Sequence, residues 1–161
     1  MAQWQWHRPA PFTLALTVRE EDTDRLGHAN NVVYVQWMES ISWQHIESLG
    51  MTWKLQSRHG KAMAIVRTEI DYLAPAFAGD ELLLGTWLTE FDGRLRSARA
   101  FELVRPSDGR TLLKAQCRHV CIDLSNQKPG RVPPPIAERL RAGLAPPVPD
   151  RGSDQQADTQ Q

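Results

Sequence analysis

The apolar run from Asn31 to Leu49 constrains the fold of this chain more than any other feature of the sequence. Its large side chains recur at the three- and four-residue spacing of a helix, and they include Tyr34, Trp37, Met38 and Ile41. Gly50 supplies the stop signal. The apolar surface is widened beyond one stripe by Val32, Val33, Val35, Trp43 and Ile46. We therefore expect a helix that is largely enclosed by the rest of the chain.

Five stretches around this helix predict β-strands. Residues 12–20 precede the helix and alternate between apolar and polar side chains, as a half-buried strand does. Four more stretches follow the helix, and turn residues such as Asp92-Gly93 separate them; they are residues 62–73, 81–91, 94–105 and 111–123. This order predicts an α+β domain in which a five-stranded antiparallel sheet wraps around one long central helix.

The C-terminal part of the chain changes composition after the last predicted strand. Residues 128–135 are rich in proline and precede a short helical segment over 136–142. The chain then ends in G-S-D-Q-Q-A-D-T-Q-Q, which cannot bury a core. We therefore expect a single domain over residues 1–144 and a disordered tail over residues 145–161.

Charge and hydropathy exclude several classes of partner. Lys plus Arg total 19 and Asp plus Glu total 19, so no net field favours nucleic acid or an acidic membrane surface. No apolar run approaches the roughly 18 residues that a membrane span needs. The opening M-A-Q-W-Q-W-H-R-P-A lacks the apolar core of a signal peptide. We expect a cytoplasmic protein that binds neither nucleic acid nor membrane.

The two cysteines lie on one predicted strand. Cys117 and Cys121 would be about 13 Å apart at the rise of a strand, whereas a disulfide tolerates about 7 Å. His119 alternates with them on the same face, but straight-strand spacing of about 6.6 Å does not converge ligands as zinc requires. We expect free thiols and no metal site.

The segment E-D-T-D-R-L-G-H-A-N-N-V-V-Y, residues 21–34, carries the most chemistry. Two carboxylates, Asp22 and Asp24, precede a glycine, a histidine and two asparagines directly before the helix. The first N–H groups of a helix have no intrahelical partner, and the helix dipole places partial positive charge there. A carboxylate beside such donors suits attack on a carbonyl, so the segment predicts an enzyme that acts on an acyl group.

Several residues in this region also have structural interpretations. Asn30 fits the helix N-cap, and Gly27 fits a tight turn close to substrate. Asp22 fits a loop scaffold better than a catalytic acid. Tyr34 either packs in the core or lines an acyl pocket. His45 falls on the enclosed surface of the helix, where we expect a core histidine.

Two blocks of the sequence resemble the hotdog-fold acyl-CoA thioesterases, specifically the 4-hydroxybenzoyl-CoA thioesterase-like family. They are D-T-D-R-L-G-H-A-N-N-V-V-Y-V-Q-W-M-E, residues 22–39, and I-D-Y-L-A-P-A-F-A-G-D-E-L, residues 70–82. The resemblance runs from Phe12 to Asp123 and more loosely through Leu140. It implies the hotdog fold, and it implies that chains pair as a homodimer or homotetramer with active sites at subunit interfaces. An exposed sheet edge in a lone chain would also favour association.

The resemblance also implies roles for individual residues. Asp24 matches the catalytic carboxylate that hydrolyses an acyl-CoA to free acid and coenzyme A, acting either as nucleophile or as general base. In the same register, the backbone N–H of Asn31 points at the thioester carbonyl. The H-A-N-N run is similar to H-V-N-N in plant acyl-carrier-protein thioesterases, so His28 is either catalytic or a loop hydrogen-bond partner. A different branch places its glutamate on the helix, and the loop acid argues against that role for Glu39.

The run G-R-L-R-S-A-R, residues 93–99, is similar to the place where relatives carry a basic cluster and a serine at a strand start. Arg94 and Arg96 share a strand face, which suits binding of coenzyme A phosphates, although a solvated strand face is the alternative. No cofactor is expected. The candidate substrate-binding residues are Gly27, Asn30, Tyr34, Arg94, Arg96 and Ser97.

Three functions remain open from the sequence. The leading one is an acyl-CoA thioesterase, and the second is a thioesterase that acts on acyl carrier protein. The third is a non-catalytic hotdog protein that binds an acyl thioester, which the presence of Asp24 disfavours. The length and chemistry of the acyl group stay undetermined.

Overall fold

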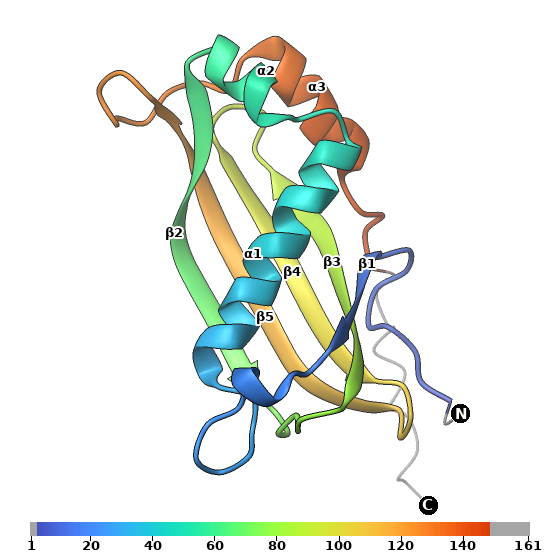
Figure 1. The fold of residues 1–161 in the computed structure, drawn as a ribbon. Helices are drawn as coiled ribbons and strands as arrows, with labels where there is room; N and C mark the ends of the chain where they lie inside the picture. Colours follow the sequence, from blue (N-terminus) through green and yellow to red (C-terminus); the bar gives the residue numbers. More distant parts are fainter. Residues whose placement is uncertain (1–2, 149–161) are drawn as a thin grey trace, which may run out of the picture.

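The structure is a computed structural model that describes residues 3–148 (Figure 1). Most of the predicted tail, from residue 149 onward, lies outside the described residues. In chain order the strands and helices are β1 (Phe12–Thr17), the 3-10 turn η1 (Glu20–Asp22), α1 (Asn31–Ser48), α2 (Trp53–Arg58), β2 (Lys61–Tyr72), β3 (Glu81–Phe91), β4 (Arg96–Arg105), β5 (Arg110–Asp123) and α3 (Pro134–Gly143).

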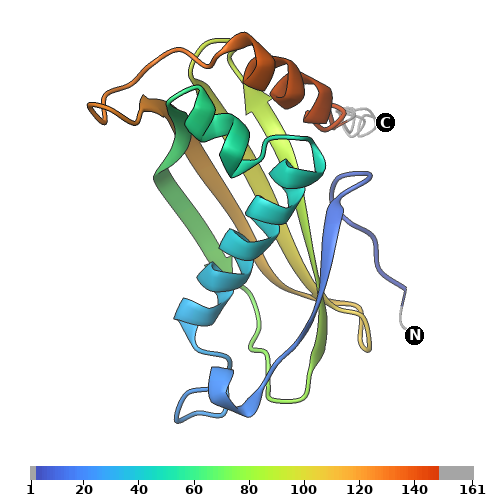
Figure 2. The ribbon, with the colours of Figure 1, turned by 45° about the horizontal axis from the view of Figure 1, so that its top comes forward.

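The five strands form one antiparallel sheet in the order β1-β3-β4-β5-β2. The sheet curves around α1, which lies against one of its faces (Figures 1 and 2). The short helices α2 and α3 sit at the end of the sheet where α1 finishes (Figure 2). The predicted α+β hotdog architecture is confirmed.

Hydrogen bonds explain where the strand boundaries differ from those predicted. β1 ends at Thr17, before Glu20, because residues 20–22 form a 3-10 turn. β4 begins at Arg96 rather than at Arg94, because the carboxylate of Asp92 accepts the N–H groups of residues 94, 95 and 96 and holds them in a turn. β3 spans the predicted residues.

The core has two parts along α1. The larger part lies between the first half of α1 and the sheet, and it contains Tyr34, Met38, Ile41, Phe101 and Leu103. The smaller part lies where α3 caps the sheet, and it contains Met51, Leu88, Cys121, Ile136 and Leu140. Both cysteines are buried free thiols, as predicted. None of the described helices has the length and apolar character needed to cross a membrane.

The expectation that α1 is largely enclosed is wrong for the single chain. Its sheet-facing side is buried, but Val32 and Val35 are 61% and 45% exposed and Trp43 is 37% exposed. The reason is that the sheet lies against one face of α1 and leaves other parts of the helix surface uncovered. The wide apolar surface of α1 therefore faces two ways, one toward this chain's sheet and one toward solvent.

Candidate active site

The loop before α1 is a tight hairpin. An antiparallel bridge joins Thr23 to Ala29, and the N–H of Asp24 donates to the carbonyl of His28 at 2.8 Å. The N–H of Gly27 donates to the carbonyl of Asp24 at 3.0 Å, and Gly27 has φ +75°. That backbone conformation favours glycine, so the predicted tight turn at Gly27 is confirmed.

The carboxylate of Asp24 is held at one oxygen and open at the other. Its Oδ1 accepts the backbone N–H of Leu26 at 2.8 Å and that of His28 at 3.3 Å. Within residues 3–148, Oδ2 has no hydrogen-bond donor. The side chain is exposed, so a substrate carbonyl or a water molecule can reach the open oxygen.

Asp22 has the scaffold role that the sequence predicts. It is buried, and its carboxylate accepts the N–H of Arg19 at 2.9 Å and two hydrogen bonds from the Arg19 guanidinium. The hydrogen bond from the Arg19 side chain lowers the pKa of Asp22 from its usual value. The carbonyl of Asp22 accepts the N–H of Asn30 at 2.8 Å, which ties the loop to the helix start.

The start of α1 presents an unsatisfied donor. Asn30 is the N-cap, as predicted, and its side chain accepts the N–H of Val32 at 3.2 Å, while its carbonyl accepts the N–H of Val33 at 2.9 Å. The N–H of Asn31 meets no acceptor in the described part of the chain. The open carboxylate oxygen and this free N–H thus belong to the same loop–helix junction.

The connection between β2 and β3 supports the loop. The N–H of Ala29 donates to the carbonyl of Ala76 at 2.8 Å, and the ring of His28 packs edge-on against Phe77 at 5.2 Å between centroids. His28 uses its backbone to hold Asp24, while its imidazole nitrogens make no hydrogen bond within residues 3–148. Both interpretations of the His28 side chain therefore remain predictions.

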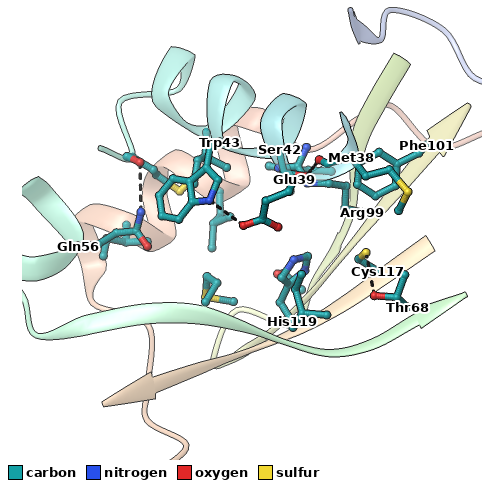
Figure 3. Close-up of a pocket in the computed structure, with 18 of the residues that line it drawn as sticks. Met38, Glu39, Ser42, Trp43, Gln56, Thr68, Arg99, Phe101, Cys117 and His119 are labelled. Carbon is teal, nitrogen blue, oxygen red and sulfur yellow. Dashed lines mark hydrogen bonds between the residues drawn. The ribbon is translucent and has the colours of Figure 1, made fainter. Parts of the chain in front are cut away.

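A cavity of about 120 Å³ lies beyond this junction, between α1 and the inner face of the sheet (Figure 3). On α1 it is lined by Val35, Glu39, Ser42 and Ile46, which follow Asn31 at three- and four-residue steps and so share its helix face. Figure 3 shows Glu39 and Trp43 extending from α1, with His119 on the strand side of the same space. The cavity wall is mostly apolar.

A buried cation forms part of the cavity wall. Arg99 on β4 is only 2% exposed, and its Nη1 donates to Nδ1 of His45 at 2.8 Å and to Oγ1 of Thr86 at 3.1 Å. Burial lowers the pKa of Arg99 to about 10, so the guanidinium stays charged near neutral pH. Burial and the charge of Arg99 lower the pKa of His45 to about 4. His45 is thus a neutral core histidine, as predicted.

Two further titratable side chains line the cavity. Burial, with a smaller effect of Arg99, lowers the pKa of His119 to about 4, and its Nδ1 is buried without a partner among the described residues. Glu39 is exposed, and its Oε1 accepts the indole N–H of Trp43 at 3.0 Å. The cavity therefore combines a neutral imidazole, a charged guanidinium and a solvated carboxylate.

The predicted site residues divide into three places. Asp24, Gly27, His28, Asn30 and Asn31 come together at the loop–helix junction. Ser97 lines the cavity. Arg94 and Arg96 are exposed at the β3–β4 turn, at the opposite end of the sheet from the junction (Figure 1).

Tyr34 belongs to the core. It is buried, its hydroxyl accepts the N–H of Ala76 at 3.3 Å, and its ring packs edge-on against Trp37 and Tyr72. Tyr34 is not among the residues that line the cavity, although Met38, one turn further along α1, is.

Sequence reasoning missed Arg99 as a site residue. The available signal was strand parity, because Arg99 alternates with Ser97, Phe101 and Leu103, which face the helix. At a core-facing position the alternation predicts an apolar side chain, so a charged arginine there is unusual. His119 has the same parity as Cys117 and was considered only as a metal ligand.

Comparisons with known proteins agree with this architecture. A model of the thioesterase-like superfamily matches residues 18–140. The long-chain acyl-CoA thioesterase FadM of Escherichia coli is 26% identical over 78% of this chain and 93% of its own length. The 1,4-dihydroxy-2-naphthoyl-CoA hydrolase of Synechocystis is 32% identical over 77% of this chain and 90% of its own length. The crystal structure of Slr0204, a 1,4-dihydroxy-2-naphthoyl-CoA thioesterase from Synechocystis, superposes with a TM-score of 0.72 at 26% identity, covering 82% of this chain and 96% of that one.

Proposed function

We propose that this chain, which belongs to the thioesterase-like superfamily and is a thioester hydrolase, cleaves acyl-CoA thioesters with the carboxylate of Asp24. One observation carries the assignment to Asp24. At a single loop–helix junction, an exposed carboxylate keeps one oxygen open and the first N–H of α1 lacks an acceptor, as far as residues 3–148 are concerned. The family relatives named as acyl-CoA hydrolases supply the substrate class.

The chemistry follows from this junction. Asp24 either attacks the thioester carbonyl, giving an acyl anhydride that water then hydrolyses, or removes a proton from the attacking water. Either route develops negative charge on the carbonyl oxygen. The N–H of Asn31 and the positive end of the α1 dipole stabilise that charge. Coenzyme A leaves as the thiol, and the acyl group leaves as the free acid.

The open oxygen of Asp24 is favoured by the way the loop is built. Asp22 anchors the loop through Arg19, and the backbone of residues 26 and 28 fixes one Asp24 oxygen. A carboxylate that is already oriented does not have to be ordered when the substrate binds, which lowers the barrier to reaction.

We further propose that the working unit is a homodimer built on β2. This strand is an edge of the sheet and carries the exposed apolar side chains of Ile65, Val66 and Tyr72. Exposed edges favour pairing with another strand. Two-fold pairing of β2 with its copy runs antiparallel, so it brings the loop–helix junction of one protomer toward the end of the other where Arg94 and Arg96 lie. In that arrangement the loop–helix junction of one protomer lies near Arg94 and Arg96 of its partner, although the junction and these arginines lie apart within one chain.

Release of thiol from a panel of acyl thioesters tests this function. The panel contains short, medium and long acyl-CoAs, an aromatic acyl-CoA and one acyl carrier protein thioester, and the wild type is compared with Asp24→Asn. Glu21→Gln is the matched control, because Glu21 is an exposed carboxylate of the same loop. We expect Asp24→Asn to lose about 10²–10⁴-fold in kcat/KM and Glu21→Gln to keep its activity.

The outcomes of this panel separate the functions left open by the sequence. Preferential cleavage of the carrier-protein thioester would show that the natural substrate carries its acyl group on acyl carrier protein rather than on coenzyme A. Equal, slow release by the wild type and Asp24→Asn on every substrate would overturn the assignment of Asp24 and favour a protein that binds acyl thioesters without cleaving them.

A further inference from the structure

We propose that the cavity beside α1 receives the far end of the acyl group, and that Arg99 binds an anionic oxygen there. The preferred substrate is then an acyl-CoA whose acyl group ends in a carboxylate. This inference rests on the proposed function, because it names the substrate class of the same site. It is carried by the burial of Arg99, by the position of the cavity along α1 and by the distribution of charge around it.

The charge of Arg99 is not balanced by the protein. Its two hydrogen-bond partners, His45 and Thr86, are neutral, and no carboxylate forms an ion pair with it among residues 3–148. Burying an unpaired ion costs several kcal/mol. Such a charge is tolerated most easily where an anion joins it, and the guanidinium forms part of the wall of a cavity that a ligand can enter.

The cavity lies in line with the catalytic junction. Its α1 lining begins at Val35, one turn after Asn31 on the same helix face, and continues through Ser42. Eleven residues of helix separate Asn31 from Ser42, which is about 16 Å. A thioester held at the N–H of Asn31 therefore directs its acyl group along this face, and a medium-length linear chain reaches the depth of Ser42. At about 120 Å³, the cavity is close in size to an engineered cavity of about 150 Å³ that binds benzene.

The other polar groups of the wall fit an acceptor at the end of the chain. His119 is neutral, and its buried Nδ1 has no partner in the described part of the chain, so one tautomer offers a second donor. The thiol of Cys117 is neutral at pH 7, because burial raises its pKa. Among the described residues, Glu39 is the only carboxylate of the wall; it is exposed, and it accepts the indole N–H of Trp43. Water screens its charge more strongly than the interior screens that of Arg99.

Matched pairs of acyl-CoAs test the inference. In each pair the chains are equally long, and one ends in a methyl group while the other ends in a carboxylate; short, medium and long pairs are compared. We expect the wild type to favour the carboxylate-ended member by about 10- to 100-fold in kcat/KM at the best length. Arg99→Met should abolish this preference while still cleaving the methyl-ended member. Arg118→Met, which removes an exposed arginine of β5, should keep it.

Binding of S-alkyl-CoA thioethers, which cannot be hydrolysed, separates this inference from the proposed function. The thioethers form pairs in which one member ends in a methyl group and the other in a carboxylate. If the wild type cleaves none of the substrates, the proposed function fails, and the ratio of the Kd values of the two thioethers decides the role of the cavity. If Arg99→Met does not fold, the wild-type Kd ratio alone decides that role. Tighter binding of the carboxylate-ended thioether supports the inference. Equal binding and equal cleavage at every length, or a preference that survives in Arg99→Met, would overturn it.

Discussion

At the scale of single residues, neighbouring residues of similar chemistry have different tasks. Asp22 is buried and bound to Arg19, whereas Asp24, two residues later, is exposed with an open oxygen. Asn30 caps the helix with its side chain, whereas the backbone N–H of Asn31 has no acceptor among the residues that the structure describes. Capping and turn rules predicted the places of Asn30 and Asp22, because such rules depend only on nearby residues. The roles of Asp24 and of the Asn31 amide were implied by the resemblance to the thioesterase family.

The role of the Asn31 amide can be tested by replacing the residue with proline. Asn31 is the first residue of α1, where proline is well tolerated, and Asn30 already has the extended backbone that a following proline requires. Asn31→Pro removes the N–H together with the side-chain amide, and we expect kcat to fall about 10²–10³-fold while the melting temperature stays close to that of the wild type.

Asn31→Ala is the matched control, since it removes the side chain and keeps the N–H. It should retain most of the activity. If Asn31→Ala lost as much activity as Asn31→Pro, the side chain rather than the backbone donor would be the important group.

The buried histidines predict a loss of stability in mild acid. The pKa of His45 is lowered to about 4 in the folded protein from its usual value of 6.5, so the unfolded chain takes up the proton first. Stability is therefore complete above about pH 6.5 and is lost as the pH falls toward 4, by about 1–3 kcal/mol for His45. His119 acts in the same direction.

Urea unfolding between pH 7 and pH 4 measures this effect. His45→Gln can still accept the hydrogen bond of Arg99 but cannot take up a proton, so its free energy of unfolding should depend less on pH. An identical pH dependence in the wild type and in His45→Gln would contradict the assignment.

At the scale of elements, periodicity in the sequence predicted the strands and the helix, but it could not show which chain covers each face. The apolar residues of α1 imply burial, yet Val32, Val35 and Trp43 remain partly exposed in one protomer. A hydropathy pattern records that a side chain avoids water and does not say whether its own chain or a second one provides the cover. The cavity could not be predicted for a related reason, because residues of α1, of the four strands β2 to β5 and of α3 together form its wall.

The edge strand β2 gives a prediction at this scale. Val66 lies at a bulge between Ile65 and Arg67 and is 60% exposed on the edge. A lysine there would place a charge in the proposed interface, so Val66→Lys should shift the protein toward monomers in sedimentation velocity and lower its activity at the same concentration. Val148→Lys, at an exposed valine of the C-terminal segment, should change neither property. Dimers of unchanged stability in Val66→Lys would show that association uses another surface.

At the scale of the whole molecule, one protomer separates two groups that the proposed reaction needs together. The loop–helix junction lies at one end of the sheet, and the β3–β4 turn that carries Arg94 and Arg96 lies at the other (Figure 1). The sequence predicted both groups from short motifs but could not give their spacing, which the sheet register sets. Pairing of β2 with its copy brings opposite ends together, so each active site would take Asp24 from one protomer and the arginines from its partner.

Complementation in mixed dimers tests this central claim most directly. One variant is Asp24→Asn, and the other combines Arg94→Ala with Arg96→Ala. If catalysis needs both the Asp24 carboxylate and the arginines, each variant alone is weakly active on an acyl-CoA. When equal amounts are unfolded and refolded together, half of the dimers are mixed, and each mixed dimer holds one site with both groups intact. We predict that hydrolysis recovers to about one quarter of the wild-type rate. A mixture no more active than its two components, or a double arginine variant with full activity, would contradict a site shared between two chains.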